Sequence, residues 1–151
     1  PITAQSMGIM LCGTVLGAKR GALAVLLFIT LTAFGLPLLS GGRGGLGVFA
    51  SPSVGFIVGF PLAAFVAGWI TSKLKLINVF YSSLLGAVVG GILILYIPGI
   101  VGMSIILDKS ISEAALIALI YLPGDCIKAF ICAMLTHTLF KLRPENVLSR
   151  I

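Results

Sequence analysis

Long apolar stretches alternate along the chain with short breaks that contain Gly, Pro, Ser or charged residues. The apolar stretches cover residues 2–17, 21–39, 52–71, 79–97 and 123–142. A helix rises about 1.5 Å per residue, so a stretch of about 20 residues covers the hydrocarbon core of a bilayer, which is about 30 Å thick. The pattern therefore predicts an all-α integral membrane protein, in which residues 1–151 form a single transmembrane domain with five crossings.

The segment between the fourth and fifth stretches is mixed in character. Pro98-Gly99 is expected to interrupt the fourth stretch, because proline removes a helical hydrogen bond. Ser110 and Glu113 have the spacing of a capping box, which predicts a helix start. Residues 113–121 then form either a short helix near the membrane interface or an extension of the last crossing. Glycines four residues apart, which permit close helix packing inside the bundle, are Gly13 and Gly17, Gly55 and Gly59, and Gly86 and Gly90.

Composition supports the membrane assignment. Hydrophobic residues make up 59% of the chain and charged residues 9%, with a mean hydropathy of +1.21. A soluble domain carries about 25% charged residues, so this class is excluded. The formal net charge of +6 comes mostly from loops that attract anionic lipid, and no alternation of basic and aromatic residues indicates nucleic-acid binding.

Lysine and arginine are unevenly distributed between alternate breaks, which predicts the orientation. One side of the membrane receives Lys19, Arg20, Lys73, Lys75, Lys141, Arg143 and Arg150. The other side receives only Arg43 and Lys109. Cytoplasmic loops are enriched in Lys and Arg, so the first side and the C-terminus are expected to be cytoplasmic. Five crossings would then leave Pro1 outside, without a Met or a signal peptide before it. We therefore expect a six-helix protein with both ends inside, whose first crossing lies outside this sequence.

The candidate functional residues lie at the start of the last apolar stretch. Asp125 and Lys128 are one helical turn apart there, and ionisable groups in a membrane span usually face a cavity and mark a substrate or ion path. On a helix, Asp125, Lys128, Cys132 and Thr136 form one stripe. The glycine-rich loop at residues 40–51 lies on the same outer side and can meet them. The alternative reading is an interfacial ion pair without a ligand.

The remaining reactive residues argue against catalysis. Arg43 is the cation of the glycine-rich loop, and it is either a ligand contact or a solvated residue. No Gly-Lys-Ser/Thr follows the glycines, so nucleotide binding is not expected. With one histidine, His137, and no paired carboxylates in a crossing, we expect no enzyme, cofactor or metal site. His137 is expected to pack or to form a hydrogen bond. The three cysteines lack metal-type spacing and are expected to be buried reduced thiols; they are Cys12, Cys126 and Cys132.

Two motifs resemble a known family of membrane proteins. They are Thr30-Leu31-Thr32-Ala33-Phe34-Gly35-Leu36-Pro37 with Ser40-Gly41-Gly42-Arg43-Gly44-Gly45, and Pro123-Gly124-Asp125 followed by Lys128. Both resemble the BioY family, the biotin-binding S components of energy-coupling factor (ECF) transporters. Pro1-Ile2-Thr3-Ala4-Gln5 and Leu135-Thr136-His137 with Phe140 are also similar to that family. The resemblance covers nearly the whole chain after the absent first helix.

The resemblance implies a six-helix S-component fold in a prokaryotic cytoplasmic membrane. It further implies capture of biotin from outside, and uptake powered by two partner ATPase subunits through a transmembrane coupling protein. Asp125 can accept a ureido N–H of biotin, and either Lys128 or Arg43 can meet the carboxylate or the ureido oxygen. Glycines around Arg43 would let the loop approach the ligand as a lid. The rival readings are an S component for another small vitamin and a non-catalytic assembly subunit.

Overall fold

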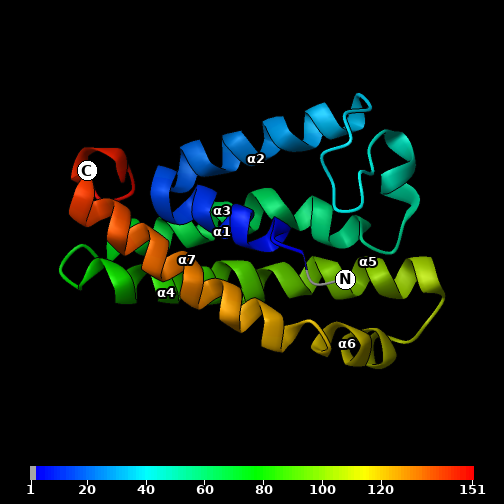
Figure 1. Ribbon diagram of the computed structural model, residues 1–151. Coiled ribbons are helices and arrows are strands. Elements are labelled where there is room, and N and C mark those ends of the chain that lie inside the picture. Colours follow the sequence, from blue (N-terminus) through cyan, green and yellow to red (C-terminus); the bar gives the residue numbers. More distant parts are fainter. Residues whose placement is uncertain (1–2) are drawn as a thin grey trace.

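Five helical elements lie side by side in a bundle, and α1 is the shortest of them (Figure 1). The computed structural model describes residues 3–151. Four of the five elements are the single helices α1 (Gln5–Leu16), α2 (Ala18–Ala33), α3 (Val54–Lys73) and α7 (Leu122–Leu142). The fifth is a continuous run of three parts: α4 (Val79–Val88), the π-helical segment η2 (Val89–Ile94) and α5 (Leu95–Leu107). The shorter elements are the 3₁₀ helices η1 (Leu46–Ala50) and η3 (Pro144–Asn146) and the helix α6 (Ile111–Leu119). The five elements correspond to the five apolar stretches.

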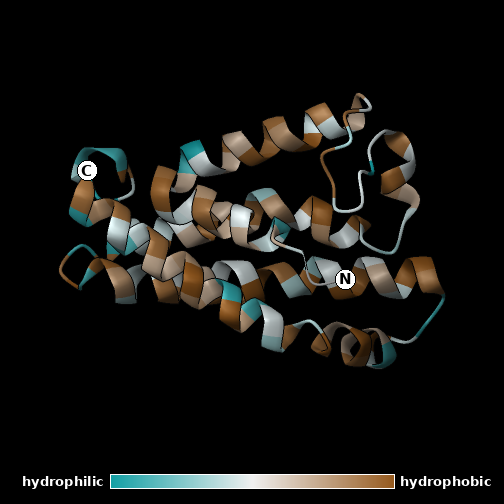
Figure 2. Ribbon diagram, viewed as in Figure 1, coloured by the Kyte–Doolittle hydropathy of each residue, from teal (hydrophilic) through white to brown (hydrophobic). Residues whose placement is uncertain are grey.

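The lengths and the hydropathy of these helices fit a multi-pass membrane protein. The 20-residue helix α3 and the 29-residue run Val79–Leu107 are each long and apolar enough to cross a membrane. The helices α6 and α7 together form a third such segment, bent by 54° between them. Hydrophobic residues dominate the helices, whereas hydrophilic residues gather at the turn between α3 and α4, at the start of α6 and at the C-terminal segment (Figure 2). The predicted all-α membrane class is confirmed.

The expected interruption at Pro98-Gly99 is wrong. Pro98 lies inside α5, and the helix continues without a break to Leu107. Membrane helices tolerate proline where neighbouring helices and local π geometry compensate for the lost hydrogen bond. Here η2 provides the π geometry directly before α5. On the other side, the Pro98 ring packs into the notch at Gly59 of α3, where a Cβ atom would lie 2.7 Å from Pro98 Cγ.

Helix α3 lies at the centre of the bundle, and glycines set how closely its neighbours approach it. Gly13 of α1 lies against Ala64 and Ala67 of α3, and Gly90 of η2 lies against the same helix. The expected use of the glycine pairs for packing inside the bundle is therefore confirmed. Gly17 has a second use, because its φ of 86° allows the chain to turn sharply from α1 into α2.

The connection before the last crossing is a separate short helix. Ser110 and Glu113 form the predicted capping box: the Ser110 hydroxyl accepts from the Glu113 N–H, and the Ser110 N–H donates to Glu113 Oε2 at 2.9 Å. Of the two readings left open, the short helix is therefore correct. The 54° bend then starts α7 with Pro123 in its first turn, where its missing N–H costs no helical hydrogen bond.

The C-terminal segment folds back over the end of the bundle that carries most of the basic residues. Val147 is fully buried, and the Ser149 N–H donates to the Val15 carbonyl at 3.1 Å. The Arg150 guanidinium donates to four carbonyls and one hydroxyl around the turn between α3 and α4; they belong to Thr71, Leu74, Lys75, Ile77 and Ser82. The tail therefore ties α1, α3 and α4 together at the end opposite the glycine-rich loop (Figure 1).

Candidate ligand-binding site

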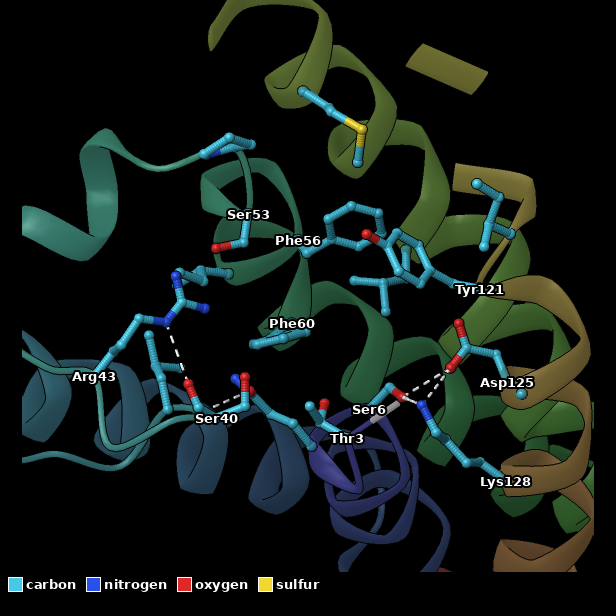
Figure 3. A pocket seen from close by; sticks show the side chains of 18 of the residues that line it. Thr3, Ser6, Ser40, Arg43, Ser53, Phe56, Phe60, Tyr121, Asp125 and Lys128 are labelled. Carbon is cyan, nitrogen blue, oxygen red and sulfur yellow. Dashed lines mark hydrogen bonds and ion pairs between the residues drawn. The ribbon is translucent and has the colours of Figure 1, made fainter. Parts of the chain in front are cut away.

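A cavity of about 400 Å³ opens where the glycine-rich loop meets the first turns of α1, α3 and α7. Its wall combines the loop, the start of the last crossing and apolar side chains of α3 and α5 (Figure 3). The predicted meeting of the loop with Asp125 and Lys128 is therefore confirmed. Small-molecule sites are typically cavities of about 300–1,000 Å³ with largely apolar walls and a few convergent polar groups.

Asp125 is the centre of the polar end of this cavity. It is only 6% exposed, and three donors converge on its carboxylate. Ser6 Oγ and Lys128 Nζ donate to Oδ1, each at 2.9 Å, and Tyr96 Oη donates to Oδ2 at 2.8 Å. These donors come from α1, α7 and α5, so the carboxylate links three helices. A buried carboxylate needs such partners, because an unpaired charge in an apolar interior is very costly.

Lys128 completes a closed set of contacts with Asp125 and Ser6. Its ammonium lies 2.9 Å from Asp125 Oδ1 and 3.1 Å from Ser6 Oγ. An ammonium has three N–H donors. Two are directed to these oxygens, which leaves one for a ligand in the cavity that Lys128 lines.

Tyr96, which donates to Asp125, follows a π-helical segment of the same helical run. A π-helical segment changes the register of the residues that follow it, and such segments are frequent at functional sites. Tyr96 is the second residue after η2, is 8% exposed and packs edge-to-face against Phe56 with 5.9 Å between ring centroids. Because the ring is held in this way, the hydroxyl has a fixed position beside the carboxylate.

Arg43 lies across the cavity from Asp125 and Lys128 (Figure 3). Its Nε donates to the Ser40 carbonyl at 3.2 Å, and the residue is otherwise exposed. The tight turn that presents it has Gly41 and Gly42 at φ values of 79° and 69°, and the Leu39 N–H donates to the Arg43 carbonyl at 3.0 Å. The two Nη atoms of Arg43 are thus presented to the cavity, on the side opposite the buried ion pair (Figure 3).

Apolar side chains separate the two charged ends. Phe56, Ile57 and Phe60 come from α3, and Leu95 and Met103 come from α5. Figure 3 shows Phe56 and Phe60 between Arg43 on one side and Asp125 on the other. The site therefore suits a small molecule with an apolar middle and hydrogen-bonding groups at both ends.

The predicted stripe on α7 divides into two halves. Asp125 and Lys128 face the cavity, whereas Cys132 and Thr136 are buried against α1, with their Sγ and Oγ1 atoms 3.4 and 2.9 Å from Thr14 Oγ1. Only the N-terminal half of the stripe therefore lines the pocket. The C-terminal half is a polar contact between two helices.

Two other sequence predictions have different outcomes. The prediction that all three cysteines are buried is wrong, because Cys126 is exposed and Cys12 is only partly buried. Cys126 follows Asp125 in the helix, so it points about 100° away from the cavity and out of the bundle. His137 packs edge-to-face against Phe80, with 6.4 Å between ring centroids, as a packing role predicts. Within residues 3–151, no three His, Cys, Asp or Glu side chains gather to form a metal-binding group.

Ser6 and Tyr96 are the site residues that the sequence does not reveal. Each is an uncharged polar residue in a predominantly apolar stretch, and such residues carry no periodic signal. The chain order also places them 119 and 29 residues from Asp125. Only the packing of α1 and α5 against α7 identifies them.

Comparison with known proteins identifies the family. The model of the BioY family matches residues 1–145. The chain belongs to the BioY family. Among its relatives, the biotin transporter BioY of Rhodobacter capsulatus is 44% identical to this BioY-family chain over 99% of the chain and 84% of the relative. The biotin transporter BioY of Rhizobium etli is 46% identical over 89% of the chain and 75% of the relative. Both relatives are named as transporters, in agreement with the expectation that the chain is not an enzyme.

A solved structure matches the fold. It is the crystal structure of the S-component for biotin from an ECF-type ABC transporter, with a TM-score of 0.87 and 31% sequence identity. The match covers 93% of this BioY-family chain and 76% of the other chain. The S-component fold expected from the resemblance is thereby confirmed.

Proposed function

We propose that this BioY-family chain is the biotin-binding S component of an ECF transporter, and that it binds biotin in the cavity between the glycine-rich loop and α7. The observation that carries the proposal is the largely buried ion pair of Asp125 and Lys128 in the wall of a cavity whose middle is lined by apolar side chains of α3 and α5. The names of the relatives and of the matched structure support the choice of biotin.

The ureido ring of biotin fits the end of the cavity that holds the ion pair. A ureido group offers two N–H donors and one carbonyl acceptor, and the carboxylate of Asp125 accepts N–H donors. Lys128 retains one N–H beside Asp125, at the place where the ureido oxygen would need a donor. Hydrogen bonds with an ionised partner are shorter and roughly twice as strong as neutral ones. This match of donors and acceptors favours the ureido ring at Asp125.

The biotin carboxylate then belongs to a cation farther from Asp125. Arg43 lies across the cavity and has both Nη atoms without a partner among the described residues. The reverse arrangement, with the carboxylate at Lys128, would place two carboxylates around one ammonium. We therefore assign the carboxylate to Arg43. The thiophane ring and the aliphatic chain would lie between them, against Phe56, Phe60 and Leu95.

The proposed orientation rests on the distribution of charge, and the proposed partners rest on similarity to an ECF S-component. The tail and the turns with most Lys and Arg lie at one end, so we place that end and the C-terminus in the cytoplasm, and the cavity at the outer face. The chain has no Gly-Lys-Ser/Thr motif to bind ATP. The purified chain alone is therefore expected to hydrolyse no ATP. From its similarity to the S-component of an ECF-type ABC transporter, we propose that two partner ATPase subunits drive uptake through a coupling protein.

Saturation binding of radiolabelled biotin to the purified chain in nanodiscs tests the proposal. The expected result is saturable binding that other vitamins do not displace. Displacement by another vitamin would assign the site to that ligand, and absence of binding to a folded chain would reject biotin.

The orientation of the ligand is tested with biotin methyl ester, which lacks the charged carboxylate. Arg43→Ala is expected to weaken binding of biotin but not of the ester, and Lys128→Ala is expected to weaken both. Lys109→Ala is the matched control, because Lys109 lies outside the cavity. If Arg43→Ala weakens binding of the ester and Lys128→Ala does not, the assignment is reversed, with the ureido ring at Arg43 and the carboxylate at Lys128.

A further inference from the structure

We propose that Ser6 and Tyr96 are positioning residues that restrict Asp125 to a single ligand-accepting site. The cavity would then select ligands with one N–H donor next to a carbonyl acceptor, as in cyclic ureas and lactams. This inference rests on the proposed function, because it concerns how the same site recognises the ureido ring.

Counting the lone pairs of Asp125 supports the restriction. A carboxylate has about four acceptor positions, two on each oxygen. Ser6 and Lys128 occupy both positions of Oδ1, and Tyr96 occupies one position of Oδ2. One position remains, on Oδ2. Because Asp125 lines the cavity, a ligand N–H reaches the carboxylate through this position.

Ser6 fixes the direction of the N–H that Lys128 offers to the ligand. Its hydroxyl donates to Asp125 Oδ1 and accepts from Lys128 Nζ at 3.1 Å, so the ammonium is held by two oxygens at once. The third N–H of Lys128 then has a defined direction. One acceptor on Asp125 and one donor on Lys128 form a complementary pair, and this pair matches the H–N–C=O edge of a urea.

Tyr96 acts through Asp125 rather than on the ligand. It is absent from the residues that line the cavity, and its ring is held against Phe56. The π-helical segment η2 sets the register that directs its hydroxyl to Oδ2. Without this hydroxyl, the carboxylate would be held only through Oδ1, and Oδ2 would have two open acceptor positions instead of one. Its bond to the ligand N–H would then be less well directed and weaker.

The test compares biotin with two cyclic carbamate analogues, in each of which oxygen replaces one ureido N–H. Replacing the N–H that meets Asp125 removes the donor and places the ring oxygen of the analogue against the carboxylate oxygen of Asp125, so that two acceptors face each other. The replacement adds no bulk. In the wild type, one of the two analogues is expected to bind about 100-fold more weakly than biotin. Tyr96→Phe is expected to bind biotin about tenfold more weakly and to reduce that discrimination about tenfold.

Matched variants separate positioning from general destabilisation. Tyr81→Phe is the control for Tyr96→Phe, because Tyr81 is 63% exposed and outside the cavity. Ser6→Ala should lose discrimination, and Ser6→Thr, which keeps the hydroxyl, should recover it. If Tyr96→Phe does not fold, the comparison of Ser6→Ala with Ser6→Thr tests the inference instead.

Equal losses for biotin and both analogues in these variants would overturn the inference, since a merely structural role weakens all three ligands alike. Wild-type binding of biotin without discrimination between the analogues would also overturn it, while leaving the proposed function intact. Failure of the wild type to bind biotin would reject the proposed function, and this inference with it.

Discussion

The ion pair between Asp125 and Lys128 predicts a stability effect that is separate from ligand binding. The two side chains are 8% and 14% exposed, so the pair is largely buried. Replacing Lys128 with methionine keeps the length of the side chain but leaves the carboxylate without its cation. Removing one partner of a buried pair costs about 3–5 kcal/mol, because the remaining charge is left uncompensated.

The structure places the expected loss for Lys128→Met at the lower limit of that range. Ser6 and Tyr96 continue to donate to Asp125 in the variant, so part of the compensation remains. We therefore expect a loss of about 3 kcal/mol. For a chain of this length, 1 kcal/mol corresponds to about 2–4 °C, which gives a decrease in Tm of about 6–12 °C.

The double variant Asp125→Asn/Lys128→Met removes both charges. Asparagine keeps the shape of aspartate and needs no cation, so the double variant is expected to be more stable than Lys128→Met alone. The coupling between the two sites should be at least about 1 kcal/mol, because residues in contact are not additive. Neither variant should bind biotin tightly. Stability and binding are thus expected to separate.

The coupling is measured by a double-mutant cycle. It compares thermal unfolding of the wild type, Asp125→Asn, Lys128→Met and the double variant in one detergent, without biotin. Lys109→Met is the matched control, because Lys109 is exposed and outside the cavity. A Tm for Lys128→Met within about 2 °C of the control, less than 1 kcal/mol on the same scale, would refute the reasoning. It would mean that the ammonium does not compensate the buried carboxylate.

Three further outcomes are expected. Arg150→Ala should lower the Tm by at least about 4 °C in a thermal melt and leave biotin affinity unchanged, because the guanidinium binds four carbonyls at the end opposite the cavity; an unchanged Tm would contradict the clamping role. Gly13→Ala should destabilise by about 1–3 kcal/mol, since its Cβ would meet the Ala64 carbonyl, whereas Gly8→Ala, with nothing within 4 Å, should not; equal melts would argue against close packing on α3. In a cysteine-free background, an impermeant maleimide applied to intact cells should label Lys109→Cys but not Lys141→Cys, and the reverse pattern would invert the orientation.

Local signals in the sequence predict much of the fold and part of the site. The capping box at Ser110 and the start of the last apolar stretch at Pro123 are both evident from a few residues, and the structure agrees with both. Asp125 and Lys128 are conspicuous because charges are rare in apolar stretches. Arg43 is conspicuous because it is the cation of a glycine-rich loop.

The features that the sequence misses depend on contacts between distant segments. Pro98 looks like a helix break, but the π-helical segment before it and the notch at Gly59 allow the helix to continue. Ser6 and Tyr96 become site residues only when α1 and α5 pack against α7. The exposure of Cys126 likewise depends on which face of α7 meets the bundle.

The comparison of Asp125→Asn with Asp108→Asn tests the central claim most directly. Both substitutions remove one carboxylate charge, but Asp108 is exposed, lies outside the cavity and has a φ of 51°, which asparagine tolerates. Equilibrium binding of radiolabelled biotin should weaken by about 1.5–3 kcal/mol in Asp125→Asn, the scale of a charge-assisted hydrogen bond, or about 10- to 150-fold. Asp108→Asn should bind like the wild type. Equal affinities for the wild type and a folded Asp125→Asn would contradict the role of Asp125 in biotin binding.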